Sequence, residues 1–258
     1  MFESPGNIKS PANIELKSNV EYLMLRHDSP NDIQNLIINF CEKYDHFKEK
    51  SASGIFVIAV GGAEATAKTY LVNEFKKLLR DRIHIIVLAM DDYLKLSRKE
   101  RKEKVDTLRE RGTMSDEDLL VYEIGNAPSL TDFESLKKNI NELKEGKPII
   151  KNIYNHTDGN IIKNREEVGP VKEGILFVEG IFALKDELDG IADLNIFVYS
   201  AEEKKSQRVA RRDSVERGHG DYLANKYFLE AQIPSYRRHI EPTIGNADVI
   251  IDTTNLFD

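Results

Sequence analysis

Short apolar runs alternate with longer amphipathic segments along most of the chain. Helices are predicted at about 68–81, 131–145, 201–217 and 221–239, where apolar residues recur at helical spacing. The candidate strands are mostly continuous apolar runs, which is typical of parallel strands buried on both faces. Alternation of strands and helices predicts a three-layer α/β domain, in which a five-stranded parallel core sheet carries helices on both faces. The candidate strands are Ile55–Val60, Ile83–Met90, Pro148–Tyr154, Ile175–Val178, Leu194–Tyr199 and Asp248–Ile251.

The first 50 residues have a different pattern. Residues 1–17 are rich in Pro, Ser, Asn and Gly and are predicted to be irregular. Ser29 and Pro30 resemble a helix start, with a cap followed by proline at the first helical position, and an amphipathic pattern continues to about Glu49. We therefore expect an N-terminal extension over residues 1–50 with one amphipathic helix, followed by the α/β domain over residues 51–258.

Composition narrows the class of protein. The net charge of −7 over 258 residues argues against a general nucleic-acid binder. A single cysteine, Cys41, excludes an internal disulfide and a cysteine-rich zinc site, and fits a reducing cytosol. The chain shows no signal-peptide pattern and no apolar run of about 18 residues. A soluble, cytoplasmic protein without a membrane segment is expected. The charged run Lys95–Arg111 predicts a solvated helix or a mobile segment.

One loop carries the strongest chemical signal. Residues 57–70, VIAVGGAEATAKTY, match the phosphate-binding pattern G-x-x-x-x-G-K-[ST] except that Ala67 replaces the second glycine. A strand precedes the loop and a helix follows it, so Lys68 and Thr69 fall at a helix N-terminus, where free N–H groups favour phosphate. Lys68 would contact the β- and γ-phosphates, and the Thr69 hydroxyl would bind Mg²⁺. The alternative is an ordinary strand-to-helix turn of small residues.

The alanine in this loop has a calculable consequence. If position 67 needs a positive φ, alanine costs about 1–2 kcal/mol there, which weakens a phosphate site without abolishing it. The alternative is a loop that follows a slightly different path, which an ordinary residue can adopt.

Further stretches in the same order resemble the uridine kinase and phosphoribulokinase family of P-loop small-molecule kinases, over about residues 55–251. After the loop come "VLAMDDYLK", similar to the family's strand-two motif, and "IYNHTDGNIIKN", similar to its acceptor-covering segment. "ILFVEGIFAL" resembles its h-h-h-E-G-I-x-A-L strand, and "RVARRDSVERGHG" its arginine-rich lid. The tail "QIPSYRRHIEPTIGNADVIID" continues the match.

The resemblance implies a kinase that uses Mg²⁺ with ATP or GTP and phosphorylates a hydroxyl group of a small molecule. Asp91, with Lys68, Arg212 and Arg217, would be catalytic, and Thr69 and Glu179 would hold the metal. Asp92 competes with Asp91, because the sequence does not say which side chain faces the site. Nucleotide contacts are expected from Gly61, Gly62, Ala63, Glu64, Ala65, Thr66, Ala67, Lys68, Thr69, Tyr70, Arg208 and Arg211.

Acceptor contacts are expected from Asp92, Tyr93, Asn126, Tyr154, His156 and His219. This part of the chain departs most from the family. Asn126 stands where an aspartate would bind ribose hydroxyls, His219 replaces a lid arginine, and His156 is shifted from the family's histidine. A bland surface histidine is an equal interpretation of His156, and a charged solvated helix is an alternative interpretation of the arginine cluster.

Three functional hypotheses therefore remain open. A nucleoside such as uridine or cytidine is the default acceptor. The second hypothesis is a kinase for a sugar, a sugar phosphate or a vitamin precursor. The third is a pseudoenzyme in which weakened nucleotide binding leaves a regulatory module, with the N-terminal helix as a partner surface. A homo-oligomer is compatible with each of them.

Overall fold

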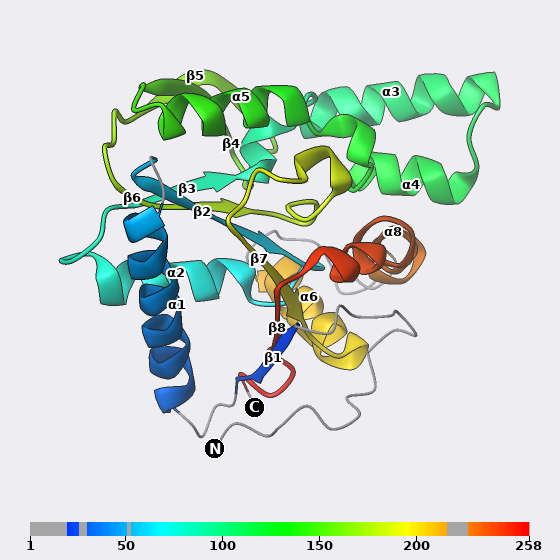
Figure 1. Ribbon diagram of the computed structural model, residues 1–258. Coiled ribbons are helices and arrows are strands. Elements are labelled where there is room, and N and C mark those ends of the chain that lie inside the picture. Colours follow the sequence, from blue (N-terminus) through cyan, green and yellow to red (C-terminus); the bar gives the residue numbers. More distant parts are fainter. Residues whose placement is uncertain (1–19, 26–29, 51–52, 216–226, 258) are drawn as a thin grey trace.

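A parallel sheet forms the centre of the protein in the computed structural model, which describes residues 20–25, 30–50, 53–215 and 227–257 (Figure 1). The sheet has six strands in the order β1-β8-β7-β2-β6-β3, and every neighbouring pair is parallel. In that order the strands are β1 (Glu21–Met24), β8 (Val249–Asp252), β7 (Leu194–Tyr199), β2 (Ile55–Gly61), β6 (Gly174–Glu179) and β3 (Ile85–Ala89).

Both faces of the sheet are covered, as the continuous apolar runs predict. Successive residues of β2 point to opposite faces: Val57 belongs to one core cluster and Ile58 to the other. Helices α1 (Pro30–Lys50) and α2 (Lys68–Leu79) cover the face of Ile58. Helix α5 (Phe133–Lys144) and the C-terminal helical segment cover the face of Val57. The three-layer α/β architecture of a P-loop kinase is thereby confirmed.

The N-terminal extension is part of this architecture. Phe40 of α1 stacks on Phe75 of α2 with ring centroids 5.2 Å apart, and both rings are fully buried. Burial of one such side chain stabilises the fold by about 1.5–3 kcal/mol, so α1 belongs to the core. The predicted cap at Ser29 lies outside the described residues, and the domain boundary near residue 50 stays a prediction.

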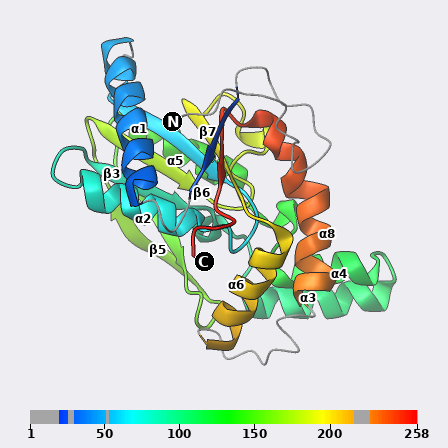
Figure 2. The ribbon, with the colours of Figure 1, turned by 90° about the horizontal axis from the view of Figure 1, so that it is seen from below.

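Strand β1 is a correction to the prediction of a five-stranded sheet. It adds a sixth strand beside β8 (Figures 1 and 2), and the Tyr22 hydroxyl donates a hydrogen bond to Asp252 Oδ2 at 2.7 Å. The segment is only four residues long. Its pairing partner lies at the other end of the chain, so no local pattern indicates the pairing.

The prediction that the run Pro148–Tyr154 belongs to the parallel sheet is wrong. It forms β4 (Ile149–Tyr154), which pairs antiparallel with β5 (Ile161–Val168) in a separate two-stranded sheet. Ile150 is 60% exposed whereas Lys151 is buried, so the apolar run does not mark a buried strand here. Strand β5 was not predicted, because its side chains are mostly exposed and polar.

The charged run after β3 is a helix, one of the two forms expected. Helix α3 (Arg98–Arg111) begins with a capping box between Ser97 and Glu100, and α4 (Asp116–Ile124) packs against it. Helix α5 is capped by Asp132, whose side chain accepts from the Ser135 N–H.

The remaining helices lie close to their predicted positions. Helix α6 (Glu202–Val215) follows β7, and residues 228–246 are helical, with the short α8 (Ile233–Ser235) between π-helical turns and a final 3₁₀ turn. The first part of the helix predicted over 221–239 lies outside the described residues. None of the helices in the described ranges is long and apolar enough to cross a membrane.

Candidate active site

The carboxyl ends of three neighbouring strands bring the predicted phosphate chemistry together. Val60 of β2 and Ala89 of β3 both lie in register with Glu179 of β6. The phosphate loop starts directly after β2, and Asp91 lies in the turn that follows β3. In open parallel sheets, ligands bind at the carboxyl ends of the strands. The loop, Asp91 and Glu179 therefore meet at the carboxyl-terminal end of the sheet.

Three residues of the loop have a positive φ, the backbone region that favours glycine. Ala67 has φ 69° and ψ 22°, and Ala65 has φ 57°, so both alanines are left-handed. Gly62 has φ 132°, and a Cβ there would lie 2.2 Å from the Val198 carbonyl oxygen, so only glycine fits. Of the two alternatives for Ala67, the structure has the strained one.

Ala67→Gly should therefore tighten the binding of Mg-ATP. Removing a left-handed alanine relieves about 1–2 kcal/mol, which corresponds to about tenfold in affinity if the strain is borne mainly in the nucleotide-bound loop. Calorimetric titration of the two proteins measures the difference. Ala63→Gly is the matched control, since Ala63 has no positive φ and glycine there should not tighten binding. Unchanged affinity in Ala67→Gly would show that the strain has no part in nucleotide binding.

Lys68 and Thr69 begin helix α2 with their side chains inside the loop region. Lys68 is 7% exposed, and its Nζ donates to the carbonyl oxygens of Gly62 at 3.0 Å and Ala63 at 2.6 Å. The Thr69 hydroxyl donates to Glu179 Oε1 at 2.7 Å. Two hard oxygen ligands thus lie together beside the helix N-terminus. This pair fits Mg²⁺, which is commonly held by one or two protein oxygens together with substrate phosphates and water.

Hydrogen bonds within the loop and from Thr253 and Arg208 hold the loop in place. The buried Thr66 hydroxyl donates to the Ala63 carbonyl at 2.9 Å, and the Thr253 hydroxyl donates to the Thr66 carbonyl at 2.9 Å. Arg208 of α6 donates from Nη1 to the Ala65 carbonyl at 3.3 Å and from Nη2 to the Thr253 carbonyl at 2.7 Å. Arg208, for which a nucleotide contact is predicted, therefore binds the backbone of the loop. Its contact with a nucleotide stays a prediction.

Asn126 contacts the loop as well. Its side-chain Nδ2 donates to Glu64 Oε1, and its backbone carbonyl oxygen accepts from the Ser235 hydroxyl at 2.9 Å. The sequence assigns Asn126 to the acceptor and Glu64 to the nucleotide. The structure brings the two side chains together, so they form one polar group between the phosphate loop and α8.

Asp91 and Asp92 have different surroundings. The side chain of Asp91 is 52% exposed, and Oδ2 lies 3.5 Å from His156 Nε2. Asp92 is 11% exposed, contacts Lys151 Nζ at 2.6 Å, and accepts from the Tyr154 backbone N–H at 2.8 Å. The geometry thus favours Asp91 as the carboxylate that is accessible to a substrate.

Of the other predicted acceptor contacts, two lie with Asp91 and one does not. The rings of Tyr154 and His156 meet edge to face at 5.1 Å, and Arg98 Nη2 donates to the His156 carbonyl at 2.9 Å. Tyr93 is buried on the far side of the turn, where its hydroxyl accepts from Asn139 at 2.9 Å. Burial raises the pKa of Tyr93 to about 12.

The lid is only partly described. Arg211 is exposed on α6, and the backbone of Arg212 lies in the same helix. Arg217 and His219 lie outside the described residues. The roles predicted for all four remain predictions. Tyr70 packs edge to face on Phe257 with ring centroids 5.3 Å apart.

Three buried polar residues of α3, α6 and the C-terminal helical segment have no signal in the sequence. Lys205 of α6 is 5% exposed, lies 3.9 Å from the Tyr236 ring centroid, and has a pKa lowered by burial. Gln232 is 8% exposed, and its Oε1 has no hydrogen-bond partner among the described residues. Arg101, in the middle of the charged run, is 2% exposed. No sequence signal separates it from the solvated charges around it.

Arg101 connects three segments of the chain: the residues before α3, the end of α4, and β4. It donates from Nε to the Glu123 carbonyl at 3.0 Å, from Nη1 to the Leu96 carbonyl at 2.9 Å, and from Nη2 to the Tyr154 hydroxyl at 3.4 Å. Arg101→Met should lower the free energy of unfolding by about 2–4 kcal/mol, since two partly buried carbonyls lose a charged donor. Denaturant unfolding measures this loss. Lys102→Met is the control, because Lys102 is exposed on the same helix; an equal loss there would contradict the role of Arg101.

Comparison with known proteins agrees with this geometry. The model of the Phosphoribulokinase / Uridine kinase family matches residues 57–257. Phosphoribulokinase of Synechocystis is 29% identical over 200 residues, covering 76% of this chain and 53% of that protein. Uridine kinase of Staphylococcus epidermidis is 27% identical over 197 residues, covering 76% of this chain and 86% of that protein.

A solved structure shows the same fold at lower identity. D-glycerate 3-kinase from Cryptococcus neoformans superposes with a TM-score of 0.59 at 12% identity, covering 85% of this chain and 95% of that one. The chain spans from 36% to 53% of the length of the phosphoribulokinases of Synechocystis, ice plant and wheat and of Uridine-cytidine kinase C of Dictyostelium.

The parallel sheet, the phosphate loop and the oxygen pair at its edge define the class of P-loop kinase folds. Within that class, the match over residues 57–257 identifies the family. The chain belongs to the Phosphoribulokinase / Uridine kinase family.

Proposed function

We propose that the protein is a Mg²⁺- and ATP-dependent kinase that transfers the γ-phosphoryl group to a hydroxyl of a small molecule. One observation carries the proposal: the Thr69 hydroxyl and Glu179 Oε1 lie 2.7 Å apart beside the loop that matches the phosphate-binding pattern. Asp91 follows the neighbouring strand at the same edge. Nucleotide binding does not require this carboxylate. Phosphoryl transfer does, because a group is needed to accept a hydrogen bond from the hydroxyl that is phosphorylated.

Each side chain has a defined role in this mechanism. The amides of the loop and Lys68 bind the β- and γ-phosphates, and Thr69 and Glu179 hold Mg²⁺, which offsets charge on the phosphate oxygens when it is bound. Asp91 accepts the hydrogen bond of the acceptor hydroxyl and orients its oxygen towards the γ-phosphorus. The oxygen–phosphorus bond forms as the bond to ADP breaks, and Asp91 takes the hydroxyl proton. Arg212 and Arg217 are proposed to stabilise the charge that spreads over the phosphoryl oxygens.

The acceptor proposed first is a nucleoside such as uridine or cytidine. Support comes from the similarity to Uridine kinase and from His156, whose side chain is 56% exposed and lies next to Asp91, where its ring can stack on a base. The alternative acceptors are a sugar, a sugar phosphate, glycerate or a vitamin precursor. Among the relatives are a Phosphoribulokinase and, as a structural neighbour, a D-glycerate 3-kinase.

A screen of ATP consumption over these acceptors tests the proposal. The wild type should release ADP with at least one acceptor, and Ala67→Gly should do so at lower ATP concentration, because its loop is unstrained. GTP replaces ATP in a second arm. If neither nucleotide binds at millimolar concentration in calorimetry, the kinase proposal fails and a regulatory pseudoenzyme takes its place. If ATP binds but no acceptor of the screen is consumed, the acceptor classes named here are wrong, and a nucleotide-binding pseudoenzyme is the remaining hypothesis.

A further inference from the structure

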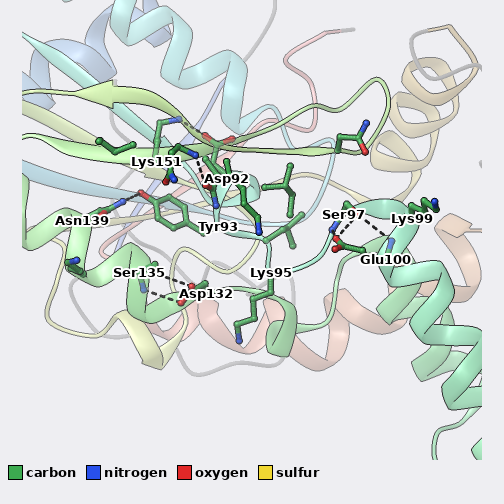
Figure 3. A pocket seen from close by; sticks show the side chains of 18 residues that line it. Asp92, Tyr93, Lys95, Ser97, Lys99, Glu100, Asp132, Ser135, Asn139 and Lys151 are labelled. Atoms are coloured by element: carbon green, nitrogen blue, oxygen red, sulfur yellow. Dashed lines mark hydrogen bonds and ion pairs between the residues drawn. The ribbon is translucent and has the colours of Figure 1, made fainter.

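A cavity of about 670 Å³ lies against Asp92 and Tyr93 of the turn that also carries Asp91. Its walls come from residues 92–100 after β3, from the first half of α5, and from the β4–β5 hairpin (Figure 3). Asp91 and the phosphate loop do not line it. This volume is in the usual range of small-molecule sites, about 300–1,000 Å³. We call it the lysine pocket, after the lining residues Lys95, Lys99, Lys138, Lys151 and Lys163.

The three carboxylates of the lysine pocket are already engaged with protein groups. Asp92 contacts Lys151 Nζ at 2.6 Å. Asp132 caps α5 and accepts from the Ser135 hydroxyl at 2.7 Å. Glu100 accepts from the Ser97 hydroxyl at 2.6 Å in the capping box of α3. Figure 3 shows these contacts along the wall of the cavity. Only Lys151 forms a close ion pair with one of these carboxylates, and five lysines against three carboxylates leave a formal surplus of two positive charges in the lining.

The other four lysines leave positive charge around the cavity. Lys95 Nζ donates only to a neutral carbonyl, that of Ser129, at 2.9 Å. Lys99 and Lys138 lie 3.8 and 3.9 Å from glutamates of their own helices, pairs that are exposed and therefore weak. Lys163 forms no ion pair within 4 Å in the described ranges, although its charge, after the hydrogen bonds from Ser97, helps to lower the pKa of Glu100. A surplus of positive charge around a concave site favours the binding of an anion.

The remaining lining residues supply neutral hydrogen-bonding groups and a small apolar surface. Ile150, which is 60% exposed on β4, faces this cavity together with Ile161. Amide side chains can donate to and accept from hydroxyl groups, and lysine binds phosphate as a point charge. The amide and hydroxyl groups come from Asn139, Asn152, Asn160, Asn164, Ser97 and Ser135.

We propose that the lysine pocket binds a phosphorylated, hydroxyl-bearing small molecule at a site separate from those for ATP and the acceptor. The phosphate group lies among Lys95, Lys138 and Lys163, and the asparagines bind the hydroxyl groups. Asp92 lines the pocket and precedes Tyr93 in the same turn as Asp91. Occupancy of the pocket therefore acts on the turn that positions the proposed catalytic carboxylate, which makes the pocket a regulatory site.

Protection of individual lysines from acetylation tests the site on the full chain, with ribose 5-phosphate as the probe. Acetylation of Lys95, Lys138 and Lys163, followed by mass spectrometry, should slow about fourfold at a probe concentration about three times Kd. Exposed lysines elsewhere, such as Lys77 on α2, should be unchanged. Ribose alone should not protect, and inorganic phosphate should protect more weakly than ribose 5-phosphate. The modification of Lys68 reports separately on phosphate in the loop.

Paired variants decide whether the lysines bind the probe. Lys138→Gln with Lys163→Gln should weaken ribose 5-phosphate about tenfold in calorimetry, a loss of about 1.4 kcal/mol. The control, Lys102→Gln with Lys104→Gln on the exposed face of α3, makes the same charge change and should leave Kd unchanged. Equal weakening in the control, or no protection of the three lysines, overturns the proposal. Phosphorylation of the probe by Mg-ATP also overturns it, because the pocket would then serve the acceptor.

Discussion

Lys68→Ala is expected to lower nucleotide-dependent phosphoryl transfer by a factor of about 10³ or more, because the loop lysine is the side-chain cation closest to the transferred phosphoryl group. In the structure this lysine is buried and bound to two carbonyl oxygens of its own loop. Its ammonium group is thus held inside the phosphate-binding region before any nucleotide arrives. Steady-state kinetics with the acceptor found in the screen measures the loss.

A neighbouring lysine supplies the control for this experiment. Lys77 is on the same helix, with a side chain that is 69% exposed and 3.8 Å from Glu74, so Lys77→Ala should leave turnover unchanged. Lys68→Ala also leaves the carbonyls of Gly62 and Ala63 without their donor, which can cost about 1–3 kcal/mol of stability. The variant is therefore compared at a temperature where circular dichroism shows both proteins folded. Full turnover by folded Lys68→Ala would disprove the assigned role of the loop.

Much of the site follows from the sequence because its signals are local. The phosphate loop is a continuous motif between a strand and a helix, and Asp91 and Glu179 directly follow apolar runs. Parallel strands place their carboxyl ends at one edge, so these three signals are sufficient to predict the meeting of the loop, Asp91 and Glu179. The register of Val60 and Ala89 with Glu179 agrees with that prediction.

The elements that were missed depend on distant partners. Strand β1 pairs with the last strand of the chain, and nothing in its four residues indicates this. Arg101 is buried because carbonyl oxygens of Leu96 and Glu123 surround its guanidinium, and carbonyl groups have no sequence signature. For Ala67 the sequence leaves two backbone paths open, and only the structure shows that the left-handed one is adopted. A backbone dihedral of this kind is set by the loop's contacts and not by residue type.

The choice between Asp91 and Asp92 also needed the structure, and it leads to opposite predictions for two adjacent carboxylates. Asp91→Asn should lower kcat by about 10²–10⁴, the usual contribution of a positioned general base. Its affinity for Mg-ATP should be unchanged, because Asp91 contacts His156 and not the loop. Kinetics and calorimetry on the same preparation separate the two quantities. An equal loss of ATP affinity would show that Asp91 belongs to the nucleotide site.

Asp92→Asn should instead weaken the fold. Burial disfavours the charge of Lys151, but hydrogen bonds to Asp92 and Glu166 outweigh it and raise the pKa of Lys151. Removing the Asp92 charge leaves this buried ammonium, 5% exposed, with only the partly exposed Glu166 at 2.7 Å. Breaking one partner of a buried pair costs about 3–5 kcal/mol, so with Glu166 retained we expect a loss of about 2–3 kcal/mol in denaturant unfolding. A fully stable Asp92→Asn protein with the kcat defect predicted for Asp91→Asn would exchange the two roles.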